Sequence, residues 1–408
     1  MTYSPHTEAD RAEMLREIGA ASMDELLAQV PAELRAGGYD WPAAVTGLVQ
    51  RGEFLTAYTP YQAEASQGTL QAIYEFQSSI ASLYGMDAAN ASLYDGATAL
   101  AEAAAAAARI TGRKKILLPE SLNPEWREVL ATYFRAKGEP ELVGIPCPSG
   151  RLDLSAVEAR LDGTVAAVVV ATPNFYGLLE DGAGLAALAH ARGALLIAAA
   201  DPVSLGVLEA PGAWGADIAV GEGQGLGSAL NYGGPYLGLF ACQKAYMRHM
   251  PGRIAGLTTD ADGRRGFVLT LQAREQHIRR ERAASNICSN EALCALASTI
   301  HLALLGPEGL KEVAELCVDK AHRLAEKVCA VPGFRRRFEG PFFNEFVLEC
   351  PVPAERVVKA LGKDGLLAGV PMGRFDRTLK NSLLVCVTEL RTDEELDRYA
   401  AALKKVAR

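Results

Sequence analysis

The stretch Ala194-Leu-Leu-Ile-Ala-Ala-Ala-Asp201-Pro-Val-Ser-Leu-Gly206 reads as a buried strand that ends in an acid. Two glycine-rich segments follow it, Ala216-Asp-Ile-Ala-Val-Gly-Glu-Gly-Gln-Gly-Leu-Gly227 and Gly233-Gly-Pro-Tyr-Leu-Gly238. No lysine occurs between Lys137 and Lys244, although this interval contains both segments. The acid at a strand end and the missing lysine together define what kind of site this region can form.

The layout is similar to that of pyridoxal-phosphate (PLP) enzymes of the aminotransferase-like fold. In those enzymes an Asp at a strand end pairs with the pyridinium nitrogen, and a Lys on the next segment forms the Schiff base. Here the second segment offers Glu222, Gly223 and Gln224, none of which can form an imine. We therefore expect a chain with a PLP-type fold that cannot hold PLP covalently by itself.

Composition excludes several classes of function. The 408 residues are 49% hydrophobic and 22% charged, with a net charge of −8 that argues against nucleic acid or an anionic membrane as a partner. No run approaches the roughly 18 apolar residues of a membrane span, and the N-terminus lacks an apolar signal core. The lack of a signal core predicts a cytoplasmic location. Neither the cysteines nor the histidines cluster at metal-ligand spacing, so we expect no metal site.

The hydrophobic pattern divides the chain into an N-terminal helical arm (1–60), a large α/β domain (61–305) and a small C-terminal α+β domain (306–408). Continuous Val/Ile/Ala runs separated by helical patterns predict a mostly parallel sheet covered on both faces. Strands are expected at 115–119, 142–146, 165–171, 194–200, 217–220 and 236–242, and in the small domain at 343–350 and 382–390.

The segment Asp95-Gly96-Ala-Thr98-Ala opens an alanine-rich helix. Small residues at a helix N-terminus let backbone N–H groups approach an anion, and a phosphate would sit here in a PLP fold. The alternative is N-capping by Asp95, whose negative charge would oppose a phosphate. We favour capping. The later run of glycines at 221–227 matches no dinucleotide or Walker pattern.

Two further segments are unusually polar. Tyr58-Thr-Pro-Tyr61-Gln is a rigid loop that could stack on a flat ring, bind a carboxylate or simply form a dimer interface. Arg residues between 274 and 282 could bind a carboxylate or belong to a solvated helix. Ser285-Asn286-Ile-Cys288-Ser-Asn290 interrupts the helical pattern with side chains that hydrogen-bond to backbone.

These motifs together carry a specific resemblance. Tyr58-Thr-Pro-Tyr-Gln-Ala-Glu-Ala-Ser-Gln-Gly68, Ser92-Leu-Tyr-Asp-Gly-Ala-Thr-Ala99, Met250-Pro-Gly-Arg-Ile-Ala-Gly256 and the block from Asp262 to Cys288 all belong to it. The chain resembles the P-protein family of the glycine cleavage system, of the first-subunit (α, N-terminal-half) type found in two-subunit glycine decarboxylases. The resemblance covers nearly the whole chain.

The resemblance implies an α2β2 assembly in which PLP is bound in the partner β subunit, which supplies the Schiff-base lysine. The assembly would decarboxylate glycine and pass the aminomethyl group to the lipoyl arm of H-protein. Tyr58, Tyr61 and Tyr94 would reach toward the partner's site across the interface. Arg282, Asn286 and Cys288 are weaker candidates for the same role. Asp201 would be a relic of the pyridinium partner.

Two alternatives remain open at this stage. The chain could be an autonomous PLP enzyme that uses a non-standard lysine such as Lys244, one strand later in Cys242-Gln-Lys-Ala-Tyr-Met. It could also be a non-catalytic scaffold that only docks H-protein. An imine absorbance of the purified chain that borohydride fixes would favour the first alternative over the subunit hypothesis.

Overall fold

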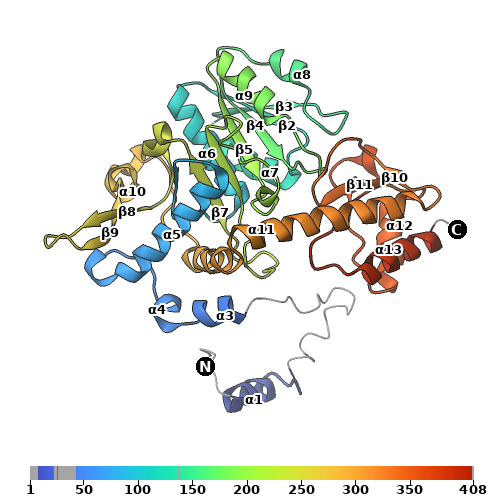
Figure 1. Ribbon diagram of the computed structural model, residues 1–408, viewed down its shortest axis with the longest axis horizontal. Coiled ribbons are helices and arrows are strands. Elements are labelled where there is room, and N and C mark those ends of the chain that lie inside the picture. The colour runs from blue at the N-terminus through green and yellow to red at the C-terminus, as the bar shows by residue number, and fades with distance from the viewer. Residues whose placement is uncertain (1–7, 23–24, 26–42, 137, 407–408) are drawn as a thin grey trace.

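The fold is built on a seven-stranded sheet that runs through the large domain (Figure 1). The computed structural model describes residues 8–22, 25, 43–136 and 138–406. The strand order is β1 (Ala88–Ala89), β7 (Gly238–Cys242), β6 (Ile218–Glu222), β5 (Leu195–Ala200), β4 (Val165–Thr172), β2 (Lys115–Pro119), β3 (Glu141–Ile145). The five strands from β6 to β3 are parallel, and β7 and β1 pair antiparallel. The predicted mostly parallel sheet is confirmed.

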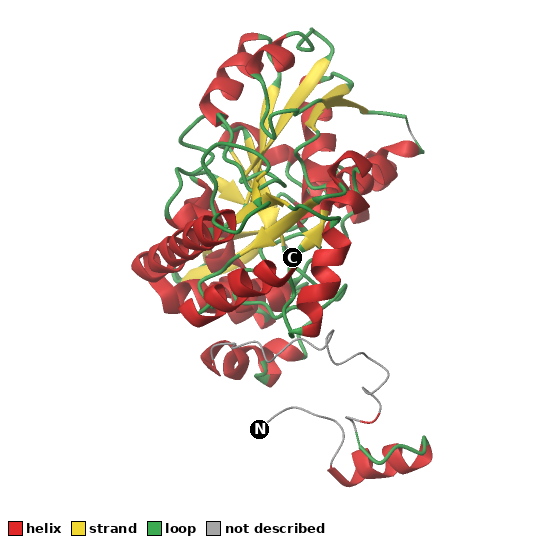
Figure 2. Cartoon of the chain, turned by 90° about the vertical axis from the view of Figure 1, so that its right-hand side faces the viewer, coloured by secondary structure: helices red, strands yellow, loops and turns green. Residues whose placement is uncertain are grey.

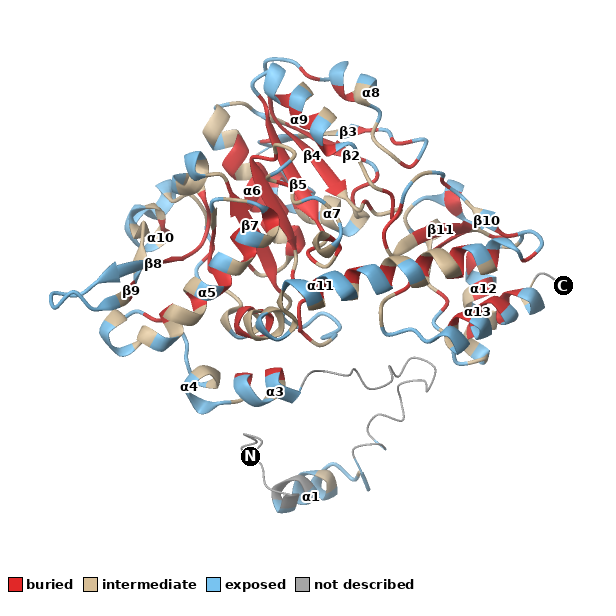
Figure 3. Ribbon diagram, in the orientation of Figure 1, coloured by how far each residue is buried: buried red, intermediate tan, exposed pale blue. Residues whose placement is uncertain are grey.

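Helices cover both faces of this sheet, and the strands between them are buried (Figure 3). On one face, α6 (Gly96–Thr111) and α7 (Pro124–Arg135) pack through Leu100, Leu130 and Phe134. On the other face lie α5 (Gln67–Tyr84), α8 (Leu154–Glu158) and α9 (Gly182–Ala191). Val and Ile side chains point alternately to the two layers, which explains why the strands read as continuous apolar runs.

A long helix, α11 (Ala292–Cys329), connects the large domain to the small one and breaks at Gly306, where φ is 61° and ψ is −176°. The small domain has a four-stranded sheet in the order β10 (Arg335–Arg336), β11 (Glu345–Glu349), β13 (Ser382–Cys386), β12 (Val370–Pro371). Helices α12 (Ala354–Lys363) and α13 (Asp393–Val406) pack on it with the second half of α11. The domain division at 305/306 stays a prediction, since α11 runs across it.

Two strands differ from the sequence-based expectation. The predicted strand at 382–390 ends at Cys386, because Thr388 and Glu389 leave the sheet and line a cavity. Residues 254–270 form a hairpin, β8 (Ile254–Thr259) and β9 (Arg265–Thr270), that was not predicted. This hairpin and the short helix α10 (Gln276–Arg279) lie beside α5 at the edge of the large domain (Figure 1).

The described part of the N-terminal arm is helical. It contains α1 (Glu8–Glu17), α3 (Ala43–Val49) and α4 (Gly52–Leu55), and Figure 2 shows α1 apart from the body of the protein. Helix α3 packs Val45 and Val49 against Leu296 and Ala297 of α11. The second helix expected from Ser22 lies largely outside the described residues.

Helix α11 is the one described helix whose length and apolar composition would suffice to cross a membrane. It packs against α5 in the large domain and against α13 in the small one. Its buried side chains join it to the cores of both domains, and 28% of its most apolar 18-residue window is buried.

Candidate functional site

A cavity of about 950 Å³ lies between the carboxyl edge of the large sheet and the small domain. Ligands of open α/β sheets bind at this edge. The strand ends contribute Pro173, Asp201 and Glu222, α11 contributes His301 and Cys317, and the small domain contributes Asn344, Glu345, Cys386 and Glu389. The cavity therefore has the position of the ligand site that the sequence predicts.

Asp201 directly follows β5 and lines this cavity, as predicted. Its Oδ1 accepts a hydrogen bond of 3.0 Å from the backbone N–H of Val203, and its backbone carbonyl accepts one of 2.7 Å from the Ser204 hydroxyl. Burial raises the pKa of Asp201 to about 6. No cation among the described residues pairs with it.

The carboxylate of Glu222, the last residue of β6, lies at the N-terminus of helix α6. Its Oε2 accepts a hydrogen bond of 3.0 Å from the backbone N–H of Gly96, and its Oε1 accepts bonds of 3.0 and 3.1 Å from those of Gln224 and Leu237. Burial raises the pKa of Glu222 to about 7, although the three hydrogen bonds oppose this shift. The protein thus supplies its own carboxylate where a PLP fold would place a phosphate.

The other donors at this helix start are also used within the chain. Asp95 forms a capping box with Thr98: its carboxylate accepts hydrogen bonds of 2.7 Å from both the backbone N–H and the hydroxyl of Thr98. The capping interpretation is therefore confirmed. The ring of Trp126 packs on Gly96 so closely that a Cβ there would lie 2.5 Å from it.

The residues of this cavity do not fit PLP. Glu222, Asp95 and Trp126 take the space and the hydrogen bonds that a phosphate would need. Among the described residues that line the cavity there is no lysine. Gln224 lines it instead, and its side chain donates a hydrogen bond of 2.6 Å to the carbonyl of Ser228. No step of catalysis can therefore be assigned to PLP bound in this chain.

Lys244 lies at the opposite edge of the sheet. Strand β7 is antiparallel to β6, with Gly238 opposite Glu222 and Cys242 opposite Ile218. Lys244 follows β7 at the start of the short helix η4 (Lys244–His249), where its backbone N–H donates to Asp87. A strand rises about 3.3 Å per residue, so the five residues of β6 separate the two edges by roughly 13 Å. This position contradicts the use of Lys244 at the cavity.

The cavity is acidic. Glu345 at the start of β11 also lines it, and burial together with the nearby Asp201 raises the pKa of Glu345 to about 7. Three carboxyl groups with raised pKa values thus share one cavity. Such a lining disfavours the binding of a phosphate or a carboxylate. This agrees with the start of α6, where Glu222 already accepts the hydrogen bond of Gly96.

The predicted interface tyrosines lie outside this cavity. Tyr58 and Tyr61 have 75% and 69% of their surface exposed, and their ring centroids are 6.5 Å apart. The Arg253 guanidinium lies 5.8 Å from the centre of the Tyr61 ring. Tyr94 is half-buried against the core beside α6. The structure therefore groups Tyr58 with Tyr61 and holds Tyr94 nearer the core.

Arg282, Asn286 and Cys288 are all exposed. Arg282 lies 3.8 Å from Glu281, an ion pair at the surface. The loop that carries Asn286 and Cys288 is fixed near the start of α6, because Asn290 donates a hydrogen bond of 2.7 Å to the carbonyl of Ala91. Their roles stay predictions. The sequence reasoning missed Trp126, the contact of Glu222 with Gly96, and Arg253.

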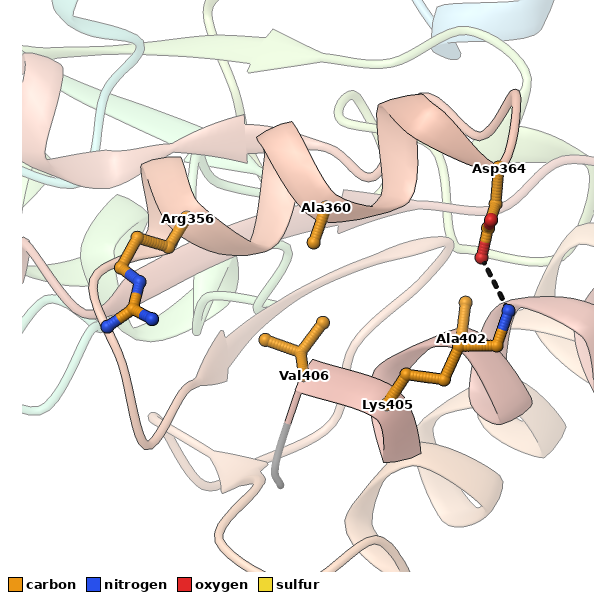
Figure 4. Close-up of a pocket in the computed structure, with 6 residues that line it drawn as sticks. All are labelled: Arg356, Ala360, Asp364, Ala402, Lys405 and Val406. Atoms are coloured by element: carbon orange, nitrogen blue, oxygen red, sulfur yellow. Dashed lines mark hydrogen bonds and ion pairs between the residues drawn. The ribbon is translucent and has the colours of Figure 1, made fainter.

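A second, smaller cavity of about 290 Å³ lies between α12 and α13 (Figure 4). Asp364 and Lys405 form an ion pair of 2.8 Å at its rim, and Ala360, Ala402 and Val406 line it. Because its acid and its lysine are already paired with each other, we interpret it as a packing gap between two helices. Among the described residues no group of three His, Cys, Asp or Glu side chains could hold a metal ion.

The sequence is similar to proteins of one family over its full length. The sequence model described as "Glycine cleavage system P-protein" matches residues 35–403. A probable glycine dehydrogenase (decarboxylating) subunit 1 from Moorella thermoacetica is 51% identical over 443 aligned positions, covering 100% of both chains. The same-named protein from Desulfitobacterium hafniense is 48% identical and is likewise covered completely.

Solved structures agree with this result. The structure of a glycine decarboxylase (P-protein) of the glycine cleavage system, in inhibitor-bound form, matches with a TM-score of 0.85 and 45% identity, covering 100% of both chains. A sphingosine-1-phosphate lyase from Burkholderia pseudomallei matches with a TM-score of 0.69 at 16% identity, covering 99% of this chain and 91% of that one. The latter similarity concerns the fold alone.

Proposed function

The chain belongs to the glycine cleavage system P-protein family, and we propose that it works as the α subunit of a two-subunit glycine decarboxylase. Its β partner binds PLP through the Schiff-base lysine, and the two chains assemble as α2β2. PLP supplies the electron sink on which glycine loses CO2. The aminomethyl group then passes to the lipoyl group of H-protein. The proposed location is the cytoplasm.

One observation carries this proposal: the cavity at the carboxyl edge of the sheet is closed to PLP by residues of the same chain. Glu222 accepts a hydrogen bond from the N–H group of Gly96 at 3.0 Å, and the described residues that line the cavity include Gln224 but no lysine. A fold of this type without its own cofactor site is expected where a homologous partner supplies that site. The subunit hypothesis explains both features, whereas an autonomous enzyme explains neither.

The surface that would face the partner contains exposed apolar and aromatic side chains. Tyr58 and Tyr61 lie in the 58–61 loop, and Leu257 and Val268 lie on the β8–β9 hairpin with 52% and 36% of their surface exposed. Gln67 of α5 holds the hairpin, since its side chain accepts from the N–H and donates to the carbonyl of Phe267, both at 2.8 Å. It also donates to the carbonyl of Ala63, shortly after the 58–61 loop, at 2.7 Å. Aromatic residues are enriched in subunit interfaces.

In the assembly this chain positions the loop and shields the partner's site from water. The Pro60 ring restricts the backbone between Tyr58 and Tyr61, so the two phenols are presented with little loss of entropy on binding. A phenol that reaches the site can hydrogen-bond to a substrate carboxylate or hold a water molecule away from it. Tyr94 would act from the core side of the same interface.

The test is to mix the purified chain with a β-type subunit and lipoyl H-protein and to measure glycine–CO2 exchange. We expect the chain alone to show neither exchange nor a borohydride-fixable imine absorbance when PLP is added. Exchange should appear on adding the β subunit. An imine formed by this chain alone would contradict the proposal. An active β subunit that gains nothing from the chain would favour a scaffold that only docks H-protein.

A further inference from the structure

Arg253 is a buried arginine that the proposed function does not use. It lies in the segment Met250-Pro-Gly-Arg-Ile-Ala-Gly256, between η4 and β8, and has only 7% of its surface exposed. Its Nη1 is buried and has no hydrogen-bond acceptor among the described residues. The guanidinium carbon lies 5.8 Å from the centre of the Tyr61 ring. Within the part of the chain that is described, this cation has no anion.

The backbone around Arg253 is held firmly in place. The Arg274 guanidinium donates to the carbonyls of Met250 and Gly252, the latter at 2.7 Å. Asn90 donates to the carbonyl of Pro251 at 3.0 Å, and the N–H of Ala91 donates to that of Arg253 at 2.9 Å. These bonds fix four consecutive residues. Such support from surrounding side chains is typical of a binding group that must keep its geometry.

A buried guanidinium without an anion is unfavourable, because it loses hydration and gains no ion pair. Arg274, the other arginine of this region, donates from both of its terminal nitrogens to backbone carbonyls and leaves only its buried Nε without an acceptor. Arg253 keeps a donor unused beside a tyrosine ring that is 69% exposed. A planar guanidinium with a free donor is suited to carboxylate or phosphate oxygens.

We propose that Arg253, covered by Tyr61, binds the oxyanion of a small molecule at the face that the chain presents to its partner. The oxyanion is either the carboxylate of the amino-acid substrate or the phosphate of the cofactor, both held mainly by the partner. This inference rests on the proposed function, because it requires the 58–61 loop to face the partner's site. The Tyr61 ring shields the cation in the free chain and moves aside when the oxyanion enters.

The experiment uses the full chain in complex with a β-type subunit. The wild-type complex is measured first; if it does not assemble or shows no glycine–CO2 exchange, the proposed function itself fails. With an active wild type, Arg253→Lys and Arg253→Gln are compared for the Kd of PLP, the KM of glycine and the association of the subunits. The expected result is a rise of about 10–100-fold in one of the first two constants, with association unchanged.

The constant that changes identifies the oxyanion: the Kd of PLP for phosphate, the KM of glycine for carboxylate. Arg374→Gln is the matched control, since its exposed guanidinium also lies over a ring, that of Phe375 at 5.6 Å, but in the small domain. This control should leave both constants unchanged. The inference is overturned if neither constant changes in the two Arg253 variants, or if subunit association weakens instead, which would indicate a carboxylate of the partner.

A measurement on the chain alone separates binding from a structural role. If Arg253 only stabilised the fold, Arg253→Met would lower the Tm. If it is an unpaired cation kept for a ligand, Arg253→Met removes an unfavourable buried charge and should leave the Tm unchanged or raise it by a few degrees. A clear fall in Tm would count against the proposal even if the complex could not be formed.

Discussion

The carboxylate of Glu222 accepts a hydrogen bond of 3.0 Å from the backbone N–H of Gly96, the first residue of α6. This bond joins the end of strand β6 to the start of a helix 126 residues earlier in the chain. A helix N-terminus carries partial positive charge and attracts anions. The protein satisfies this attraction internally, so the helix start is not available to a bound phosphate.

Replacing Glu222 by Ala should destabilise the chain. The backbone N–H groups of Gly96, Gln224 and Leu237 would lose their acceptor, at a cost of about 2–4 kcal/mol in the free energy of unfolding. Glu222→Gln keeps an acceptor oxygen and should cost less. Urea unfolding with and without inorganic phosphate measures both effects: the Ala variant alone should gain stability from phosphate. Equal stability of the three proteins would show that these hydrogen bonds contribute nothing.

The stability of the chain should fall as pH rises from about 4 to 7. Burial raises the pKa of Asp201 to about 6 and that of Glu345 to about 7, from ordinary values of 3.8 and 4.5. In this window the folded chain keeps protons that the unfolded chain has already released, so increasing pH favours unfolding. Each group contributes about 3 kcal/mol.

Asp201→Asn and Glu345→Gln should each flatten this pH dependence, because an amide does not titrate. Urea unfolding at a series of pH values from about 4 to 8 gives the slope. The solvent-exposed Glu355 of α12 offers a control, since Glu355→Gln should leave the slope as in the wild type. A wild-type stability that rises with pH through this range would contradict the raised pKa values.

Gly96→Ala should cost about 1–3 kcal/mol, because its Cβ would lie 2.5 Å from the Trp126 ring and 3.0 Å from the backbone nitrogen of Glu222. Trp126→Leu should recover part of this loss in the double variant, which a double-mutant cycle of unfolding free energies would show. Gly68→Ala, in helix α5 with open space around it, should be neutral or stabilising. Additive effects of Gly96→Ala and Trp126→Leu would argue against this contact.

Tyr61→Phe and Tyr94→Phe test the contribution to the partner's site. Each removes one hydroxyl and preserves the ring, so assembly with the β subunit should be unchanged while glycine–CO2 exchange falls by roughly 10-fold or more. Tyr232→Phe is the control, because this tyrosine is 73% exposed and has no proposed role. If both variants assemble normally and keep full rates, these hydroxyls take no part in the reaction.

The sequence predicts the large sheet well because its strands are buried on both faces. The runs 116–119, 165–171 and 195–200 contain no polar side chain. The β8–β9 hairpin was missed although its turn carries clear signals: Asp260 caps the turn, and Gly263 has a φ of +76°. Its strands alternate less clearly, because only part of one face packs on α5.

The site was predictable only in part. An acid after a buried strand places Asp201 at the carboxyl edge of the sheet, and the missing lysine is visible directly. The roles of Glu222 and Arg253 depend on Gly96 and Tyr61, which are distant in the sequence. No local pattern encodes such pairs. Only the fold shows that Glu222 accepts a hydrogen bond at the positive end of α6 and that Arg253 has no carboxylate partner among the described residues.

The position of Glu222 also bears on how this chain could change in evolution. A single Gln224→Lys substitution would return a lysine to the segment, but the helix start would still be bonded to Glu222 and covered by Trp126. Recovery of a working site would need several substitutions at once, and removing Glu222 first would reduce stability. Under the proposed function, the dependence of this chain on a partner chain is therefore hard to reverse by single substitutions.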